Sequence, residues 1–308
     1  MSTLYIHHSA FAEHQTPAGH PERPDRYRAV EATLSQEAFK GLQRDTAPVA
    51  PVEVTRYAHT DAYVDALEKV RPNEGHVYLD GDTVMEPTTW EVVLRGVGGT
   101  LKGIDAVMEG RAQNVFVGCR PPGHHAESQR AMGFCLFNNV AIGARHAQKK
   151  HGLERVAIVD FDVHHGNGTQ EIFYSDPSVL YASTHQMPLY PGTGARSETG
   201  EGNIFNAPLA PGDGGSELRN AFENHILPAF DTFKPELIIV SAGFDAHVRD
   251  PLASLRMVED DFAWVTRQIR DKAEKLCEGR LVSVLEGGYD LEGLSGSVAA
   301  HVTELMRG

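Results

Sequence analysis

Two carboxylates and an imidazole in the second half of the sequence make a candidate set of metal ligands. Asp162 and His164 are two positions apart, and side chains at that spacing in an extended segment point to the same side. With Asp245 they provide three protein ligands and leave coordination positions open, as a catalytic zinc site requires. The same ligands also suit iron(II) and manganese. The sequence therefore predicts one catalytic divalent cation, with Zn²⁺ expected and Fe²⁺ as the alternative.

Two adjacent histidines and one tyrosine could carry the proton transfers that such a centre needs. His124 and His125 follow a Pro-Pro-Gly segment, and an imidazole exchanges protons near neutral pH without a large shift of its pKa. Tyr289 follows two glycines, which would let its ring approach closely and donate an O–H to a developing oxyanion. Asp160 would orient His124 or help to hold a monovalent ion. For the histidines alone, hydrogen bonds to loop backbone are the competing interpretation.

Each of these residues lies at or just after the end of a short apolar run rich in β-branched side chains. Runs of this kind are typical of strands that are buried on both faces of a parallel sheet. Such runs occur at residues 4–6, 114–119, 156–161, 179–183, 236–244 and 281–286. Because the carboxyl ends of neighbouring parallel strands surround one crevice, where such folds bind ligands, we expect the reactive side chains to meet there.

Amphipathic segments separate these runs. The apolar residues of the two clearest helical segments are Leu218, Phe222, Ile226 and Phe230 in one, and Phe262, Val265, Ile269, Ala273 and Leu276 in the other. Alternating strands and helices predict an α/β fold with a central, mainly parallel sheet. Glycine and proline cluster at the expected strand ends, and neither an internal repeat nor a Pro/Ser-rich linker is found. We therefore expect a single domain over residues 1–308.

Composition excludes several classes of protein. The 308 residues are 41% hydrophobic and 23% charged, which is typical of a folded soluble domain. The net charge of −14 disfavours direct binding of nucleic acid, although it could attract a cationic substrate. Neither a membrane span nor a secretory signal is found, so a cytoplasmic location without membrane partners is expected. The three cysteines, Cys119, Cys135 and Cys277, are widely spaced and are expected to be reduced thiols.

Several motifs, in order along the chain, resemble those of the zinc-dependent histone deacetylase family, in its class II-like bacterial amidohydrolase branch. They are HPERPDR at 20–26, RPPGHHA at 120–126, GFCLFNN at 133–139, VDFDVHHGNGTQ at 159–170, YPGTG at 190–194, SAGFDA at 241–246 and EGGY at 286–289. The resemblance implies the three-layer α/β sandwich of the arginase and deacetylase superfamily. It also implies the same metal ligands, histidine pair and tyrosine as those proposed above.

The resemblance adds residues that the patterns alone do not single out. Phe134 and Tyr190 match the aromatic walls that enclose an aliphatic lysyl stem, and Arg26 matches an arginine of an internal acetate-release region. The family also holds structural potassium ions, partly through main-chain carbonyls. The matching positions are Asp160, Asp162, His164, Ser183 and Thr184 for one ion, and Phe173, Asp176, Val179 and Asn203 for a second.

Two positions depart from particular branches of the family. Asn167 stands where class I enzymes carry an Asp partner for the second histidine, and an uncharged partner should leave His125 easier to deprotonate. Leu252 stands where polyamine-selective relatives can carry a glutamate that recognises the substrate. These departures favour a class II-like deacetylase and weaken the acetylpolyamine alternative.

The predicted reaction is the metal-dependent removal of an acetyl or short acyl group from the ε-amine of acyl-lysine. The first alternative is a small-molecule N-acyl amidohydrolase that acts on acetylpolyamines, for which Asp80 and Asp82 could bind the cationic substrate or, otherwise, a peptide backbone. A binuclear manganese ureohydrolase and a non-catalytic binding module are weaker alternatives, because one complete ligand set and all the catalytic groups are present. The sequence is compatible with a homo-oligomer and does not fix its size.

Overall fold

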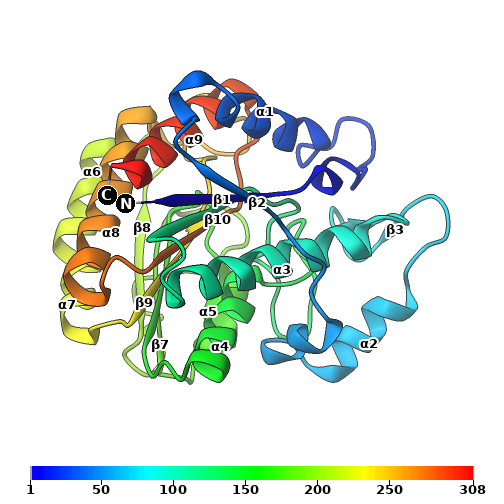
Figure 1. The fold of residues 1–308 in the computed structure, drawn as a ribbon, viewed down its shortest axis with the longest axis horizontal. Coiled ribbons are helices and arrows are strands. Elements are labelled where there is room, and N and C mark those ends of the chain that lie inside the picture. The colour runs from blue at the N-terminus through cyan, green and yellow to red at the C-terminus, as the bar shows by residue number, and fades with distance from the viewer. Residues whose placement is uncertain (1, 308) are drawn as a thin grey trace.

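A central sheet of eight strands dominates the computed structural model, which describes residues 2–307 (Figure 1). All neighbouring strands in the sheet are parallel, in the order β2-β1-β5-β10-β9-β6-β7-β8. The strands are β1 Thr3–His7, β2 Gln43–Thr46, β5 Asn114–Val117, β6 Val156–Asp160, β7 Val179–Gln186, β8 Ile204–Leu209, β9 Leu237–Ala242 and β10 Leu281–Leu285. The expected parallel α/β sheet is therefore confirmed.

The four strands that precede the predicted site residues are the four central neighbours β5, β10, β9 and β6. Their register brings Val117 beside Val284 and Asp160 beside Ser241, so the strands end at one level of the sheet. All four strands stop one or two residues earlier than the apolar runs suggest. The apolar residues beyond the strand ends, such as Phe161 and Phe244, are still buried, because they pack against the rings of Phe262 and His301.

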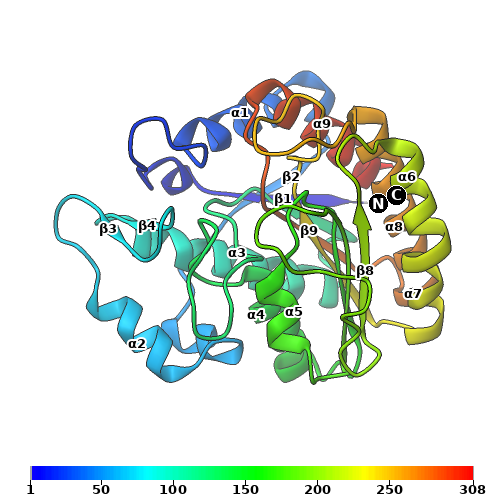
Figure 2. The same ribbon diagram turned by 180° about the vertical axis from the view of Figure 1, so that it is seen from behind.

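Helices cover both faces of the sheet, and successive strand residues alternate between two cores. In β6, Val156 and Ile158 face one core, whereas Ala157 and Val159 face the other. The first core packs under α2 Asp61–Lys69, α3 Thr89–Met108, α4 Asn139–His151 and α5 Asn167–Phe173. The second packs under α1 Pro24–Leu34, α6 Gly215–Ala221, α7 Leu227–Phe233, α8 Glu259–Cys277 and α9 Leu291–Met306. These two layers and the sheet make the three-layer sandwich that was expected (Figures 1 and 2).

Local chemistry defines the ends of several helices. The Asn138 side chain accepts a hydrogen bond from the Ala141 backbone N–H at the start of α4, and Gly152 ends the helix with a φ of 71°. At the start of α8 the Asp261 carboxylate accepts a hydrogen bond from the Val258 N–H. The helix expected from Ser216 is interrupted by a π-helical turn at Phe222–Ile226, which separates α6 from α7.

The sequence patterns did not reveal the two edge strands. β2 has the sequence QRDT and is largely exposed, so it lacks the apolar residues that identify a buried strand. β8 contains Pro208, which lacks an N–H and is tolerated in a sheet mainly at an edge. Both strands are defined by pairing with one neighbour and not by local pattern.

The segment between β2 and α3 extends away from the sheet. It contains α2 and the small hairpin of β3 Val77–Tyr78 and β4 Val84–Met85, which lie on the right of Figure 1. None of the helices in residues 2–307 is long and apolar enough to cross a lipid bilayer. The three cysteines are buried free thiols, in agreement with the reduced state expected from their spacing.

Candidate metal centre and active site

The loops after β6 and β9 bring the three predicted metal ligands together. One ligand atom from each of Asp162, His164 and Asp245 lies within 4.8 Å of the other two. The His164 Nδ1 is 3.2 Å from an Asp162 carboxylate oxygen and 3.1 Å from one of Asp245. The expectation that these side chains meet at the carboxyl edge of the sheet is thus met by the geometry.

Backbone groups and glycines fix the orientation of the two carboxylates. The Gly287 N–H donates to Asp162 Oδ2 at 2.8 Å, and the Val163 N–H donates to Asp245 Oδ1 at 2.8 Å. A Cβ atom on Gly243 would lie 2.1 Å from Asp162 Oδ2, and one on Gly287 would lie 2.2 Å from Asp245 Oδ2. Only glycine therefore allows the backbone to approach the carboxylates this closely.

The electrostatics of this set fit a bound divalent cation. Both carboxylates are buried, and burial together with the charge of Asp162 raises the pKa of Asp245 to about 7. Burial favours a neutral His164, yet hydrogen bonds to Asp162 and Asp245 raise its pKa to about 10. Buried facing carboxylates require compensating positive charge, and two carboxylates with one imidazole are ligands that zinc accepts. The chain therefore has a donor set that suits the expected cation.

The two adjacent histidines have different partners. His124 Nδ1 is 2.9 Å from Asp160 Oδ2, so Asp160 orients His124 as the sequence suggested. Burial lowers the pKa of His124, but Asp160 and Asp162 together raise it well above its ordinary value. Burial and the neighbouring charges of His124 and His164 instead hold the pKa of His125 well below its ordinary value. The pair thus divides into a ring that favours its charged form and a ring that favours its neutral form.

Hydrogen bonds also select the tautomer of His125. Its Nδ1 lies 2.8 Å from the Asn167 amide oxygen, which can only accept, so Nδ1 carries the proton and Nε2 is free to accept one. The Asn167 amide nitrogen donates to Glu127 Oε1 at 2.8 Å, which keeps the amide in this orientation. Gly133 contacts the same ring, and a Cβ there would lie 2.4 Å from His125 Cδ2.

Tyr289 faces this centre from the end of β10. Its N–H donates to Asp250 Oδ2 at 2.7 Å, and the Arg26 guanidinium lies 4.8 Å from the centre of its ring. Burial raises the pKa of the Tyr289 hydroxyl well above its ordinary value, although Arg26 opposes the shift, so the hydroxyl keeps its proton. Arg26 itself donates to the carbonyl oxygens of Glu286 and Gly288 and is completely buried behind the tyrosine.

A pocket of about 360 Å³ leads from the surface to these residues. It is lined by His20, Pro21, Asp82, His125, Gly133, Phe134, His164, Leu189, Tyr190, Leu252 and Tyr289. The Phe134 and Tyr289 rings are 5.8 Å apart, and the Tyr190 ring is 5.2 Å from that of His125. All three predicted channel residues, Phe134, Tyr190 and Leu252, therefore line the pocket.

The two aspartates of the segment before β4 have different environments. Asp80 Oδ1 accepts hydrogen bonds from the N–H groups of Asp82 and Thr83, at 3.0 and 2.6 Å, and so closes a turn. Asp82 lines the pocket, and its carbonyl oxygen lies 2.9 Å from His20 Nε2. Of the two, Asp82 is the residue placed to meet a substrate.

The residues matched to potassium sites have hydrogen-bond partners within the chain. Ser183 Oγ lies 2.8 Å from His185 Nδ1, and Ser183 of β7 pairs with Asp160 of β6 in the sheet. The Asn203 side-chain nitrogen donates to the carbonyl oxygens of Phe173, Asp176 and Val179, at 2.9, 3.0 and 2.8 Å. The three carbonyl oxygens thus face one point, at which the Asn203 amide lies. Potassium binding there, and near Ser183 and Thr184, stays a prediction.

Three residues that support the centre were not identified from the sequence. Glu127 orients Asn167, Asp250 holds the backbone of Tyr289, and Glu286 accepts hydrogen bonds from the Gly123 and His124 N–H groups, at 2.6 and 3.1 Å. Burial raises the pKa of Glu286 to about 7. Each acts through hydrogen bonds between distant segments. The only signal in the sequence was nearness to a motif or, for Glu286, its place in EGGY at 286–289.

The model of the family described as "Histone deacetylase domain" matches residues 20–305. The chain belongs to the histone deacetylase family. This membership supports an amide hydrolase and confirms the family that the sequence motifs resemble.

Histone deacetylase relatives from several kingdoms match most of the chain. "Histone deacetylase 10, chloroplastic" of Oryza sativa subsp. japonica is 40% identical over 95% of this chain and 69% of its own length. "Histone deacetylase-like amidohydrolase" of Pseudomonas aeruginosa is 40% identical over 88% of this chain and 73% of its own length. A solved structure of the HDA15 HD domain covers 98% of this chain and 88% of that chain, with a TM-score of 0.93 and 36% identity. The arginase and deacetylase fold is thereby confirmed for this histone deacetylase family member.

Proposed function

We propose that this protein removes an acetyl or short acyl group from the ε-amine of acyl-lysine in peptides or proteins, with one catalytic Zn²⁺ per chain. The observation that supports this best is the pocket, whose inner end carries His125, His164 and Tyr289 and whose walls are Phe134 and Tyr190. Aromatic walls suit the methylene stem of lysine. Acylation removes the lysine charge, so the modified side chain can enter an apolar pocket without a large desolvation cost.

Asp162, His164 and Asp245 would hold the cation. When bound, a divalent cation supplies a Lewis acid for the acyl carbonyl and lowers the pKa of a water molecule. His125 Nε2 faces the pocket without a proton, so it is placed to take the proton from the attacking water. The Tyr289 hydroxyl keeps its proton and donates to the oxyanion that forms at the acyl carbon.

The environments of the two histidines suggest how the amine leaves. His125 lines the pocket, so after accepting a proton it can return that proton to the departing amine. His124 is tied to Asp160 and is held in its charged form, which suits electrostatic stabilisation of the transition state better than proton exchange. We therefore assign both proton transfers to His125.

An acetylpolyamine is the second candidate substrate, and Asp82 at the pocket is the observation that favours it. A carboxylate there could pair with the distal ammonium group of a polyamine or accept a hydrogen bond from a peptide N–H. Leu252 lines the same pocket and cannot pair with a cation. The apolar rim at Leu252 favours acyl-lysine.

A substrate panel tests the proposal. Purified protein, stripped with a chelator and reloaded with zinc, would be assayed on acetyl-lysine peptides, longer acyl-lysine peptides and acetylspermidine. We expect zinc-dependent hydrolysis of an acyl-lysine peptide with a higher kcat/KM than for acetylspermidine. Asp82→Asn should lower the kcat/KM for acetylspermidine more than that for the peptide, because only the polyamine presents a free ammonium group. Hydrolysis of acetylspermidine alone would replace the proposal by its alternative, and zinc-loaded protein inactive on the whole panel would overturn it.

A further inference from the structure

A second group of potential metal ligands lies outside the site described above. His146 Nε2 and His151 Nε2 both face one carboxylate oxygen of Asp105, at 2.9 and 2.8 Å. One ligand atom from each of the three residues lies within 4.8 Å of the other two. The Lys150 ammonium contacts the other oxygen of Asp105 at 2.7 Å. Two imidazoles and one carboxylate therefore converge on a single point.

This cluster is at the opposite edge of the sheet from the catalytic crevice. Asp105 is in the last turn of α3, which leads into β5, and His146 and His151 are near the end of α4, which leads into β6. The two helices pack side by side on one face of the sheet (Figure 1). The ligands thus come from two helices that meet near the amino ends of β5 and β6.

Two of the three ligand separations are close to those around a bound tetrahedral ion, and the third is within 4.8 Å. Ligand atoms around a zinc ion with bonds of about 2.0 to 2.1 Å are separated by about 3.3 Å. The present separations of 2.8 and 2.9 Å would need to widen by only a few tenths of an ångström. The His146 and His151 ring centres are 5.9 Å apart, so the rings are not stacked and each can turn an Nε2 atom toward a shared ion.

Partial exposure leaves room for the remaining ligand. The side chains of His146, His151 and Asp105 are 11%, 14% and 19% exposed, so water can reach the point between them. Lys150 is half exposed and holds only the second oxygen of Asp105, which leaves the first oxygen to bind an ion alone. A protein ligand set of two histidines and one aspartate prefers a zinc-class divalent ion over Mg²⁺ or Ca²⁺.

We propose that Asp105, His146 and His151 form a second zinc site that joins α3 to α4. The ion is held by the two Nε2 atoms, one carboxylate oxygen and water. In the metal-free protein the two neutral imidazoles donate their Nε2–H groups to Asp105. When zinc binds, each ring carries its single proton on Nδ1 instead, so that Nε2 can bind the ion. The site stabilises the helical layer and plays no part in the chemistry of the pocket.

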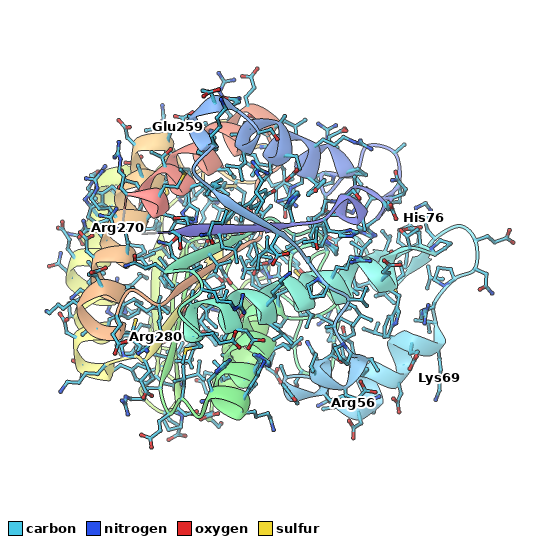
Figure 3. The ribbon with its side chains drawn as sticks, viewed as in Figure 1. Arg56, Lys69, His76, Glu259, Arg270 and Arg280 are labelled. Carbon is cyan, nitrogen blue, oxygen red and sulfur yellow. The ribbon has the colours of Figure 1, made fainter. Side chains whose placement is uncertain are left out.

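Zinc content measures the site directly. Zinc-loaded protein would be dialysed against a buffer that fixes free zinc at a micromolar level, and zinc per chain would be determined by elemental analysis. We expect two zinc ions per wild-type chain, one in His151→Gln and two in the matched control His76→Gln. His76 is an exposed histidine in the segment before β3, far from α4 in the view of Figure 3. One zinc per wild-type chain, or two in His151→Gln, would overturn the proposal.

A variant without a ligand of the catalytic centre allows zinc binding at the second site to be measured alone. In Asp245→Ala we expect one zinc to remain and to be lost when His151→Gln is added. Zinc binding at this site should raise the unfolding temperature of Asp245→Ala by a few degrees, because a ligand that binds only the folded state stabilises it. Added zinc should leave the unfolding temperature of the double variant unchanged. Equal zinc-induced shifts in the single and double variants would show that the ion binds elsewhere. Circular dichroism would establish that each variant is folded.

Discussion

Two clusters of aspartate and histidine lie at opposite ends of the strands of the same sheet, one at the carboxyl ends and one near the amino ends. Asp162, His164 and Asp245 follow the carboxyl ends of β6 and β9 and are almost fully buried. Asp105 and His151 belong to the ends of α3 and α4 and remain partly exposed. The side-chain types are similar, so the difference between the clusters lies in their surroundings.

The surroundings differ in how the carboxylates are held. In the inner cluster, backbone N–H groups from distant loops fix Asp162 and Asp245, and a pocket leads to them. In the outer cluster, Asp105 is held by side chains alone. Parallel sheets place strand-end loops around one crevice, and the pocket beside the inner cluster lies in that position. Position in the fold, more than ligand type, therefore distinguishes the proposed catalytic centre from the proposed structural site.

The largest effect is expected from removing a ligand of the inner cluster. Asp245→Ala should abolish detectable hydrolysis of acyl-lysine peptides, because two remaining ligands cannot retain the catalytic ion. Turnover and zinc per chain would be measured together. A variant that keeps both would show that Asp245 is not a ligand.

A smaller but still large effect is expected at the tyrosine. Tyr289→Phe should lower kcat by about 10² to 10³, the usual cost of removing one oxyanion donor. Zinc content and unfolding temperature should match those of the wild type, since the hydroxyl is not a metal ligand. Turnover close to wild type would remove Tyr289 from the mechanism.

Acidification should distinguish deeply buried histidines from those at the surface. Burial lowers the pKa of His301 to about 3, and its ring bonds Thr266 and Ser283. Below a pH of about 6.5 the unfolded chain gains a proton at His301 that the folded chain does not, so stability falls as the pH decreases. Between pH 7 and pH 5 the wild type should lose about 2 kcal/mol more unfolding free energy than His301→Gln. Urea unfolding at both pH values would measure this difference, and equal losses would contradict it.

A change in the orientation of Asn167 should have an effect of intermediate size on kcat/KM. Glu127→Ala should let the Asn167 amide turn its nitrogen toward His125, which would disfavour the tautomer with a free Nε2. We expect kcat/KM to fall by about tenfold, the lower end of the cost of losing an outer hydrogen-bond partner in a metal site. Glu127→Gln keeps an acceptor oxygen and should stay near the wild type. Equal values for the two variants across the pH profile would dismiss this role for Glu127.

The smallest effect is expected at the outer cluster. In the presence of a chelator, Lys150→Ala should cost no more than about 1 kcal/mol of unfolding free energy, because an exposed ion pair contributes little. Urea unfolding would give the value. A loss of several kcal/mol would mean that this cluster is as rigidly built as the inner one.

The sequence predicts the centre of the molecule better than its periphery. Buried parallel strands such as β6 and β9 are apolar on both faces, so their positions and the residues that follow them can be read from local pattern. The edge strand β2 is polar, and its pairing with β1 depends on residues far away in sequence. Local pattern cannot show such pairing.

The contacts that support the site could not be predicted from the sequence for the same reason. Glu127 and Asp250 act through hydrogen bonds to residues 40 and 39 positions away, and no spacing rule describes such pairs. His146 and His151 are five residues apart, which is not the usual three- or four-residue spacing of partners on one helix face, and their third partner belongs to α3. The roles of the site residues stay predictions until the variants are measured.

The position of β10 has a consequence for how the chain acquires its activity. It is the last strand along the sequence, yet it lies in the sheet between β5 and β9. Until the ribosome has made it, those two strands each expose an unpaired edge, and such edges invite aggregation. Tyr289 follows this strand, so a nascent chain stopped before Leu281 would expose unpaired strand edges and would lack the tyrosine that the proposed mechanism uses.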